Sequence, residues 1–87
     1  MKIYITSHNS GPSWQREDIY IDGIFATEER ASEIIPEQFR HYEVTLESQY
    51  NNAQYRHPIR NDATAQVVRH WMADGWWWSV SEHEVVG

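Results

Sequence analysis

The feature that most constrains this chain is an aromatic stretch near its C-terminal end, Trp76-Trp77-Trp78-Ser79-Val80-Ser81. Aromatic and β-branched side chains favour extended backbone, so residues 76–85 are predicted to form a strand. Because alternate side chains of a strand point to opposite faces, Trp76, Trp78 and Val80 are expected to share the core face. Trp77 is then expected on the outer face among serines, which makes it a candidate interface residue.

The segment before this strand is predicted to be a helix over about residues 62–74. Asn61 or Asp62 would cap its start, and Gly75 would end it in the left-handed conformation that glycine adopts without a Cβ penalty. Its apolar positions recur at helical spacing. They are Ala63, Val67, Val68, Trp71 and Met72.

Three earlier segments have the alternation of strands. Residues 2–7 form the first predicted strand and residues 18–25 the second, joined as an antiparallel hairpin by a long loop. Gly23 is predicted to mark a bulge, after which Ile24 and Phe25 turn towards the core. Residues 41–47 form the third, half-buried strand.

A short helix is predicted between the second and third strands. Thr27 is its expected N-cap, and Ala31, Ile34 and Ile35 are its expected buried stripe. Pro36 disfavours helical backbone at the preceding residue, so the helix is expected to end there. The order β-β-α-β-α-β predicts a single α+β domain over residues 1–87, with a mainly antiparallel four-stranded sheet and both helices on one face.

The composition limits the partners of the chain. Its 87 residues include thirteen acidic and seven basic side chains, for a formal net charge of −6. Such a balance disfavours direct binding to nucleic acid, whose phosphates are neutralised by Lys and Arg, and favours a basic protein surface or solubility alone. We expect no membrane partner and a cytoplasmic location, because no signal peptide, cysteine or apolar run of about 20 residues is present.

No motif in the sequence predicts catalysis, a metal or another cofactor. His70 with Asp74, and Glu82 with His83 and Glu84, lack the spacing of specific metal sites. A nucleophile elbow and a glycine-rich phosphate loop are also lacking. The chain is therefore predicted not to be an enzyme.

The candidate site residues are of binding type. The loop over residues 48–60 combines tyrosine with arginine, which are enriched at interface hot spots and also stack on bases. Trp14 and Trp77 are candidates for an interface, including a homodimer, and four glutamates on two predicted strands form a candidate acidic stripe. The predicted partner-binding residues are Trp14, Tyr50, Tyr55, Arg56, Arg60, Trp77, Glu43, Glu47, Glu82 and Glu84.

Part of the chain resembles small bacterial and phage proteins that open with a hairpin of the K-I-Y-I-T kind. Their pattern continues with G-x-F-x-T-x-E-x-A, here Gly23 to Ala31, and ends with W-x-V-x-E-x-E-V, here Trp78 to Val85. These motifs are structural and imply a fold. In size, acidity and aromatic content the chain also resembles phage inhibitors of bacterial defence, anti-CRISPR proteins above all.

Three functional hypotheses follow. The first is a non-enzymatic inhibitor that binds a bacterial nucleic-acid-targeting defence complex, such as a CRISPR effector, through acidic and aromatic surface. The second is a sponge that traps a small nucleotide with Tyr55, Arg56 and Arg60. The third is a structural or interaction module without inhibitory activity.

Overall fold

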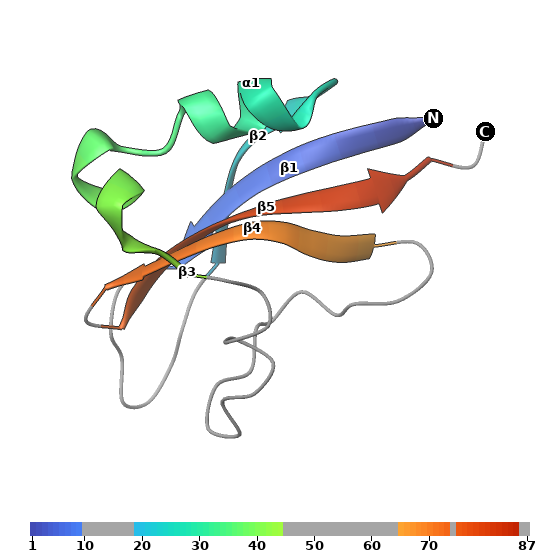
Figure 1. Cartoon of the computed structure of the whole chain (residues 1–87). Coiled ribbons are helices and arrows are strands. Elements are labelled where there is room, and N and C mark those ends of the chain that lie inside the picture. Colours follow the sequence, from blue (N-terminus) through green and yellow to red (C-terminus); the bar gives the residue numbers. More distant parts are fainter. Residues whose placement is uncertain (10–18, 45–64, 74, 86–87) are drawn as a thin grey trace.

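The fold is α+β, with a five-stranded antiparallel sheet in the order β2-β1-β5-β4-β3. A computed structural model describes residues 1–9, 19–44, 65–73 and 75–85. The strands are β1 (Lys2–Asn9), β2 (Ile19–Phe25), β3 (Glu43–Val44), β4 (Ala65–Ala73) and β5 (Trp76–Glu84). The predicted hairpin of the first two strands is confirmed, because β1 and β2 pair antiparallel. The aromatic strand β5 lies at the centre of the sheet, between β1 and β4 (Figure 1).

The predicted second helix is wrong, because its residues form β4. This strand pairs with β5, and the register shifts between Val67 and Arg69, so that Val68 is an extra residue. A bulge of this kind changes which face the following side chains occupy. It therefore places apolar residues at positions 67, 68, 71 and 72, a spacing that is also typical of a helix. Gly75 does have positive φ, 85°, but in the turn between β4 and β5.

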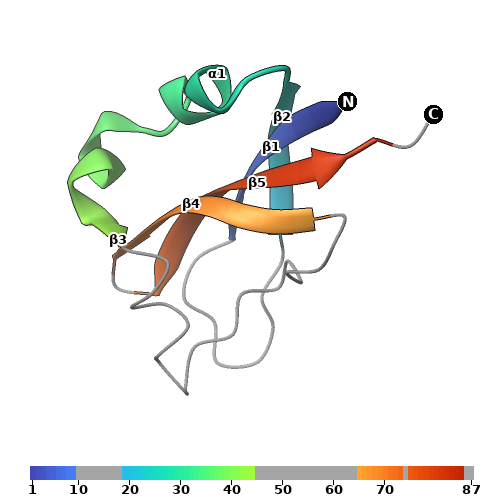
Figure 2. The same ribbon diagram turned by 45° about the vertical axis from the view of Figure 1, so that its right-hand side comes forward.

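The predicted third strand is largely wrong as well. Residues Glu37–Tyr42 form a 3-10 helix, η1, and the strand that follows, β3, has two residues within the described part of the chain. The prediction of four strands and two α-helices therefore becomes, among the described residues, five strands, one α-helix and one 3-10 helix. Both helical segments cover the same face of the sheet (Figures 1 and 2).

The first helix is confirmed as α1 (Glu28–Glu33). The Thr27 side chain caps it by accepting a hydrogen bond of 3.2 Å from the Arg30 backbone N–H. Thr6 on β1 donates a hydrogen bond of 2.6 Å to the carbonyl of Ala31, which ties the helix to the sheet. Ala31 is buried as predicted, but Ile34 is exposed.

The core lies between the helices and the sheet. It is built on Ala31, Ile35, Trp71 and Val80, all of which are buried. Partly buried side chains from β1, β2, β4, β5 and η1 pack against them, namely Tyr4, Phe25, Phe39, Val68 and Trp78. The bulge residue Val68 thus contributes to this core.

The opposite face of the sheet is also buried, and this reverses the prediction for two tryptophans. Trp77 is 2% exposed, whereas Trp76, expected in the core, is 42% exposed at the start of β5. Val67 and His70 on β4 are buried there too. The predicted alternation of side chains along β5 is confirmed. The prediction for Trp77 is wrong because side chains are buried on both faces of the sheet.

Candidate protein-binding surface

Strand β2 is an edge strand that exposes a row of isoleucines. Ile19, Ile21 and Ile24 are 44%, 66% and 63% exposed. They pair with Asn9, Ser7 and Ile5 of β1, which lie on the face opposite the helices. Ile21 and Ile24 are three residues apart and would point to opposite faces in a regular strand. The register shift at Asp22 brings both side chains to the same face. The bulge predicted near Gly23 therefore exists, and it aligns Ile24 with the other two isoleucines instead of turning it into the core.

The other side of the same edge is polar and aromatic. The His8 ring is stacked between Tyr20 and Trp78, with centroid distances of 5.3 and 4.3 Å. Its Nδ1 lies 2.6 Å from Asp22 Oδ2, so the carboxylate of the bulge residue is held against β1. This stack fixes the orientation of β2 and leaves Tyr20 half exposed.

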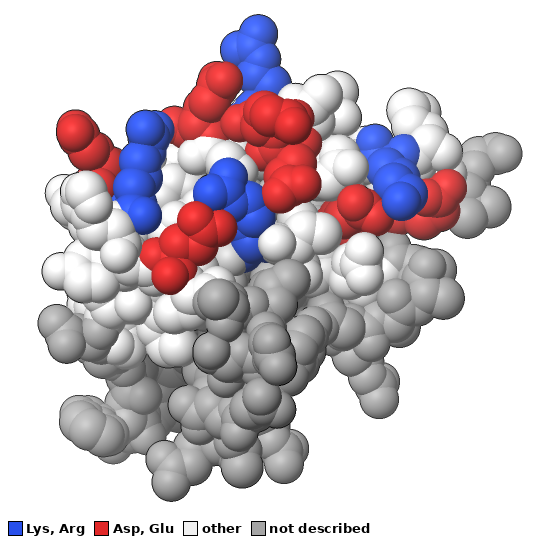
Figure 3. All heavy atoms as spheres, viewed as in Figure 1, with Lys and Arg blue, Asp and Glu red and all other residues white. Residues whose placement is uncertain are grey.

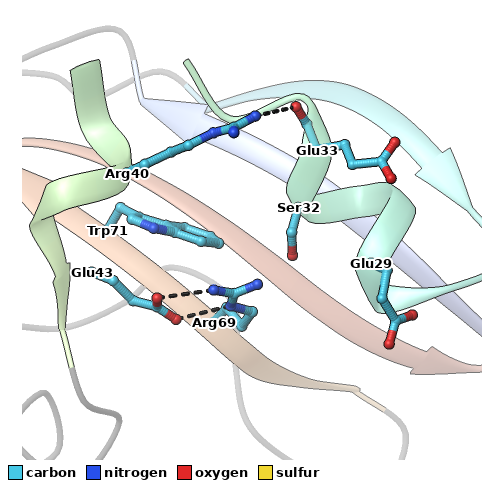
Figure 4. A pocket seen from close by; sticks show the side chains of 7 residues that line it. All are labelled: Glu29, Ser32, Glu33, Arg40, Glu43, Arg69 and Trp71. Carbon is cyan, nitrogen blue, oxygen red and sulfur yellow. Dashed lines mark hydrogen bonds and ion pairs between the residues drawn. The ribbon is translucent and has the colours of Figure 1, made fainter. Parts of the chain in front are cut away.

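A hollow of about 360 Å³ lies between α1, η1 and β4, and charged side chains line it (Figure 4). Arg69 donates two hydrogen bonds to the Glu43 carboxylate, at 2.8 and 2.9 Å, and its guanidinium lies 4.9 Å from the centre of the Trp71 ring. The Glu43 carboxylate raises the pKa of Arg69. Arg40 donates to the backbone carbonyls of Ile35 and Glu33. Both guanidinium groups therefore brace the fold through their Nε and Nη2 atoms.

Glu82 is the centre of a second polar cluster, on the helix-facing side of β5. Its carboxylate lies 3.0 Å from Lys2 Nζ and accepts hydrogen bonds from Tyr4 at 3.2 Å and Gln66 at 3.4 Å. The bond to Lys2 is the main reason that the pKa of Glu82 is lowered, and the same bond raises the pKa of Lys2. Burial, followed by the bond to Glu82, raises the pKa of Tyr4.

These pairings divide the predicted acidic stripe among internal partners. Glu43 is bound by Arg69, Glu82 by Lys2, and Glu84 lies 3.3 Å from the N-terminal ammonium. On the face drawn in Figure 3, acidic and basic side chains of the described residues are mixed over α1, η1 and the adjoining sheet. The described glutamates of the stripe are therefore engaged in ion pairs within the fold.

A row of small polar side chains crosses the sheet on the face opposite the helices. Ser7, Ser79 and His70 lie side by side on β1, β5 and β4, and His70 Nδ1 is 2.7 Å from Ser79 Oγ. All three residues are buried. The Ser7 hydroxyl is the buried side-chain group without a hydrogen-bond partner in the described part of the chain. A serine hydroxyl paired with a histidine can act as a nucleophile. Ser79 and His70 are both buried, so a substrate would not reach the Ser79 hydroxyl.

The four predicted site residues that the structure describes do not converge on one surface. Trp77 is buried in the sheet, and Glu43, Glu82 and Glu84 are spread over β3 and β5. The remaining predicted residues lie outside the described residues. They are Trp14, Glu47, Tyr50, Tyr55, Arg56 and Arg60.

The exposure of the β2 isoleucines was not predicted, because apolar residues in a strand usually indicate a core position. A signal was present in Asp22-Gly23, since both residue types are depleted in central strands and Gly often marks a bulge. Polar and glycine residues in the middle of an otherwise apolar strand are more typical of an edge.

No protein-family model, curated protein or solved structure matches the chain. The resemblance to small phage proteins therefore stays a prediction that rests on its sequence motifs. Among the described residues, no helix has the length and apolar character needed to cross a membrane. Nor do three His, Asp or Glu side chains gather in that part of the chain as metal ligands would.

Proposed function

We propose that the chain is a non-enzymatic protein-binding domain that inhibits a bacterial nucleic-acid-targeting defence complex. The observation that carries the binding part is the exposure of Ile19, Ile21 and Ile24 in one row. Large apolar side chains grouped on the surface of a small acidic domain are typical of a protein interface. The inhibitory part rests on the size, acidity and phage-like motifs of the sequence.

The polar clusters support binding over catalysis. Arg40, Arg69 and the Glu82 carboxylate are engaged in internal bonds, and the Ser79–His70 pair is buried. Three of the exposed large apolar side chains of the described residues stand in the row on β2. A nucleotide sponge built on Tyr55, Arg56 and Arg60 remains the alternative, and those residues lie outside the described part of the chain.

The test is a plasmid-interference assay in a bacterium with an active CRISPR effector, together with affinity purification of the tagged chain. We expect plasmid survival to rise and the effector to copurify in stoichiometric amount. Ile21→Ser should reduce both effects, while Ile34→Ser, on the helical side, should leave them unchanged. A thermal shift with nucleotides, and no copurifying protein, would instead support the sponge, because ligand binding stabilises the folded state.

A further inference from the structure

We propose that the outer edge of β2 is a docking site for an extended segment of the partner, which adds to the sheet as a sixth strand. The segment would carry apolar side chains on one face and basic side chains on the other. This inference deepens the proposed function and rests on its binding part alone. It names the mode of recognition and the chemistry of the partner.

The first support is the length and charge of the two edge strands of the sheet. The edge at β3 is two residues long in the described part of the chain, and its Glu43 side chain is charged and bound to Arg69. Short, charged edges of this kind resist pairing with another chain. The edge at β2 has seven residues, none of them Lys, Arg or Pro, and its one charged residue is Asp22 at the bulge. Among the described strands, β2 is therefore the longer edge and the one that exposes a row of apolar side chains.

The second support is the pattern of side chains along β2. In an added strand, alternate side chains would lie beside the isoleucine row, since cross-strand neighbours share a face. These positions of the partner segment are therefore apolar. Main-chain hydrogen bonds would give affinity, and the side chains next to the row would give specificity, as in other cases of strand addition.

The third support is charge. On the other side of the edge, the partner would meet Tyr20 on a chain of net charge −6, while the Asp22 carboxylate is bound to His8. Basic side chains at the alternate positions of the partner segment complement this charge. A second copy of the chain would instead bring another net charge of −6 to the same edge, so charge favours a basic partner over self-pairing.

The bulge sets the geometry of the docked segment. It interrupts the regular ladder at Asp22, so the outer edge offers two short stretches, 19–21 and 23–25. Bulges also limit uncontrolled edge pairing in natural sheets. The edge is therefore suited to a segment that follows the bend, and less suited to indefinite strand stacking.

The test uses the full chain and an acetylated, amidated nine-residue peptide of alternating valine and lysine. We expect the peptide to slow hydrogen exchange at the outward-facing amides of residues 19–25 by about tenfold or more at saturation. The same peptide with alternate amides methylated on one edge has lost its donors, and should give no protection. A version with glutamate in place of lysine should bind about fivefold more weakly or worse, because it repels the acidic chain.

Matched variants separate the edge from the rest of the surface. Ile21→Lys should abolish the protection, Ile34→Lys should retain it, and thermal unfolding of both should show that the fold is intact. Protection that is absent, lies outside β2 or persists with the methylated peptide would overturn strand addition. So would a dimer in sedimentation equilibrium that Ile21→Lys dissociates, since the occupant would then be a second copy.

The outcomes for this inference and for the proposed function are distinct. If a defence effector copurifies but the peptide gives no protection on β2, the mode of docking is wrong and the inhibitor function stands. If the peptide protects β2 but the plasmid-interference assay shows no effect, the edge is a docking site and the inhibitor function is wrong.

Discussion

At the scale of single residues, adjacent tryptophans of β5 have opposite environments. Trp77 is buried, and Trp76 is 42% exposed. Replacing a buried large aromatic side chain by alanine typically costs about 3–5 kcal/mol, whereas surface changes stay within about 0.5 kcal/mol. Urea denaturation should therefore show a large loss of stability for Trp77→Ala and a small one for Trp76→Ala. Equal losses would contradict the assignment of Trp77 to the interior.

Glu82 makes stability depend on acid pH. Its pKa lies below the ordinary value of 4.5, chiefly because Lys2 donates to it, so the folded state favours the ionised form. The resulting stabilisation is present above the unfolded pKa and is lost as the pH falls through the lowered folded value. In thermal unfolding followed from pH 7 to 3, Glu82→Gln should be less stable at pH 7 and show a flatter acid profile. Glu84→Gln, at an exposed ion pair, is the control, and wild-type behaviour of both variants would contradict the role of Glu82.

At the scale of elements, the first two strands, α1 and β5 were predictable because their alternation or capping is local. The N-cap at Thr27 and the aromatic run at 76–78 each indicate one structure without reference to the rest of the chain. Strand β4 was not predictable, since a single extra residue, Val68, gives its apolar residues a helical spacing. The register shift depends on pairing with β5, which no local pattern contains.

The candidate site was even less predictable from local patterns. An apolar strand with a bulge is compatible with the core or with an edge, and the choice depends on strand order. In this fold β1 pairs with β5 on one side and β2 on the other, which leaves β2 at the edge. The exposure of its isoleucines follows from that strand order and from the bulge at Asp22, which changes the face on which the following side chains lie.

Gly23, beside the bulge of β2, leaves room for the Phe25 ring. A Cβ at this position would lie 2.7 Å from two ring atoms of Phe25, a side chain that packs against the core. Gly23→Ala should therefore displace the ring and cost about 1–3 kcal/mol, as in other overpacked sites. The same substitution in a Phe25→Ala background should cost less, and the double-mutant cycle from chemical denaturation measures the difference. Additive losses would show that the ring is not the cause.

At the scale of the whole molecule, the net charge of −6 coexists with internal pairing of Glu43, Glu82 and Glu84. The charge that a partner meets at a distance is negative, while the described carboxylates of the predicted acidic stripe are already engaged within the fold. Long-range charge governs the rate of encounter, and buried contacts govern the lifetime of a complex. Acidity and the apolar edge of β2 therefore have separate roles in the proposed complex.

This separation makes a kinetic prediction for the complex with a copurified effector. Raising the ionic strength from 0.05 to 0.5 M shortens the screening length, so the association rate constant should fall by about tenfold or more, with little change in dissociation. Ile21→Ser should raise the dissociation rate constant with little change in the association rate constant. Ile34→Ser should change neither constant. Surface plasmon resonance measures both constants. A dissociation rate that rises with salt as steeply as association falls would mean that desolvated acid–base pairs hold the complex together. In that case the carboxylates, and not the isoleucine row, would be the principal contact.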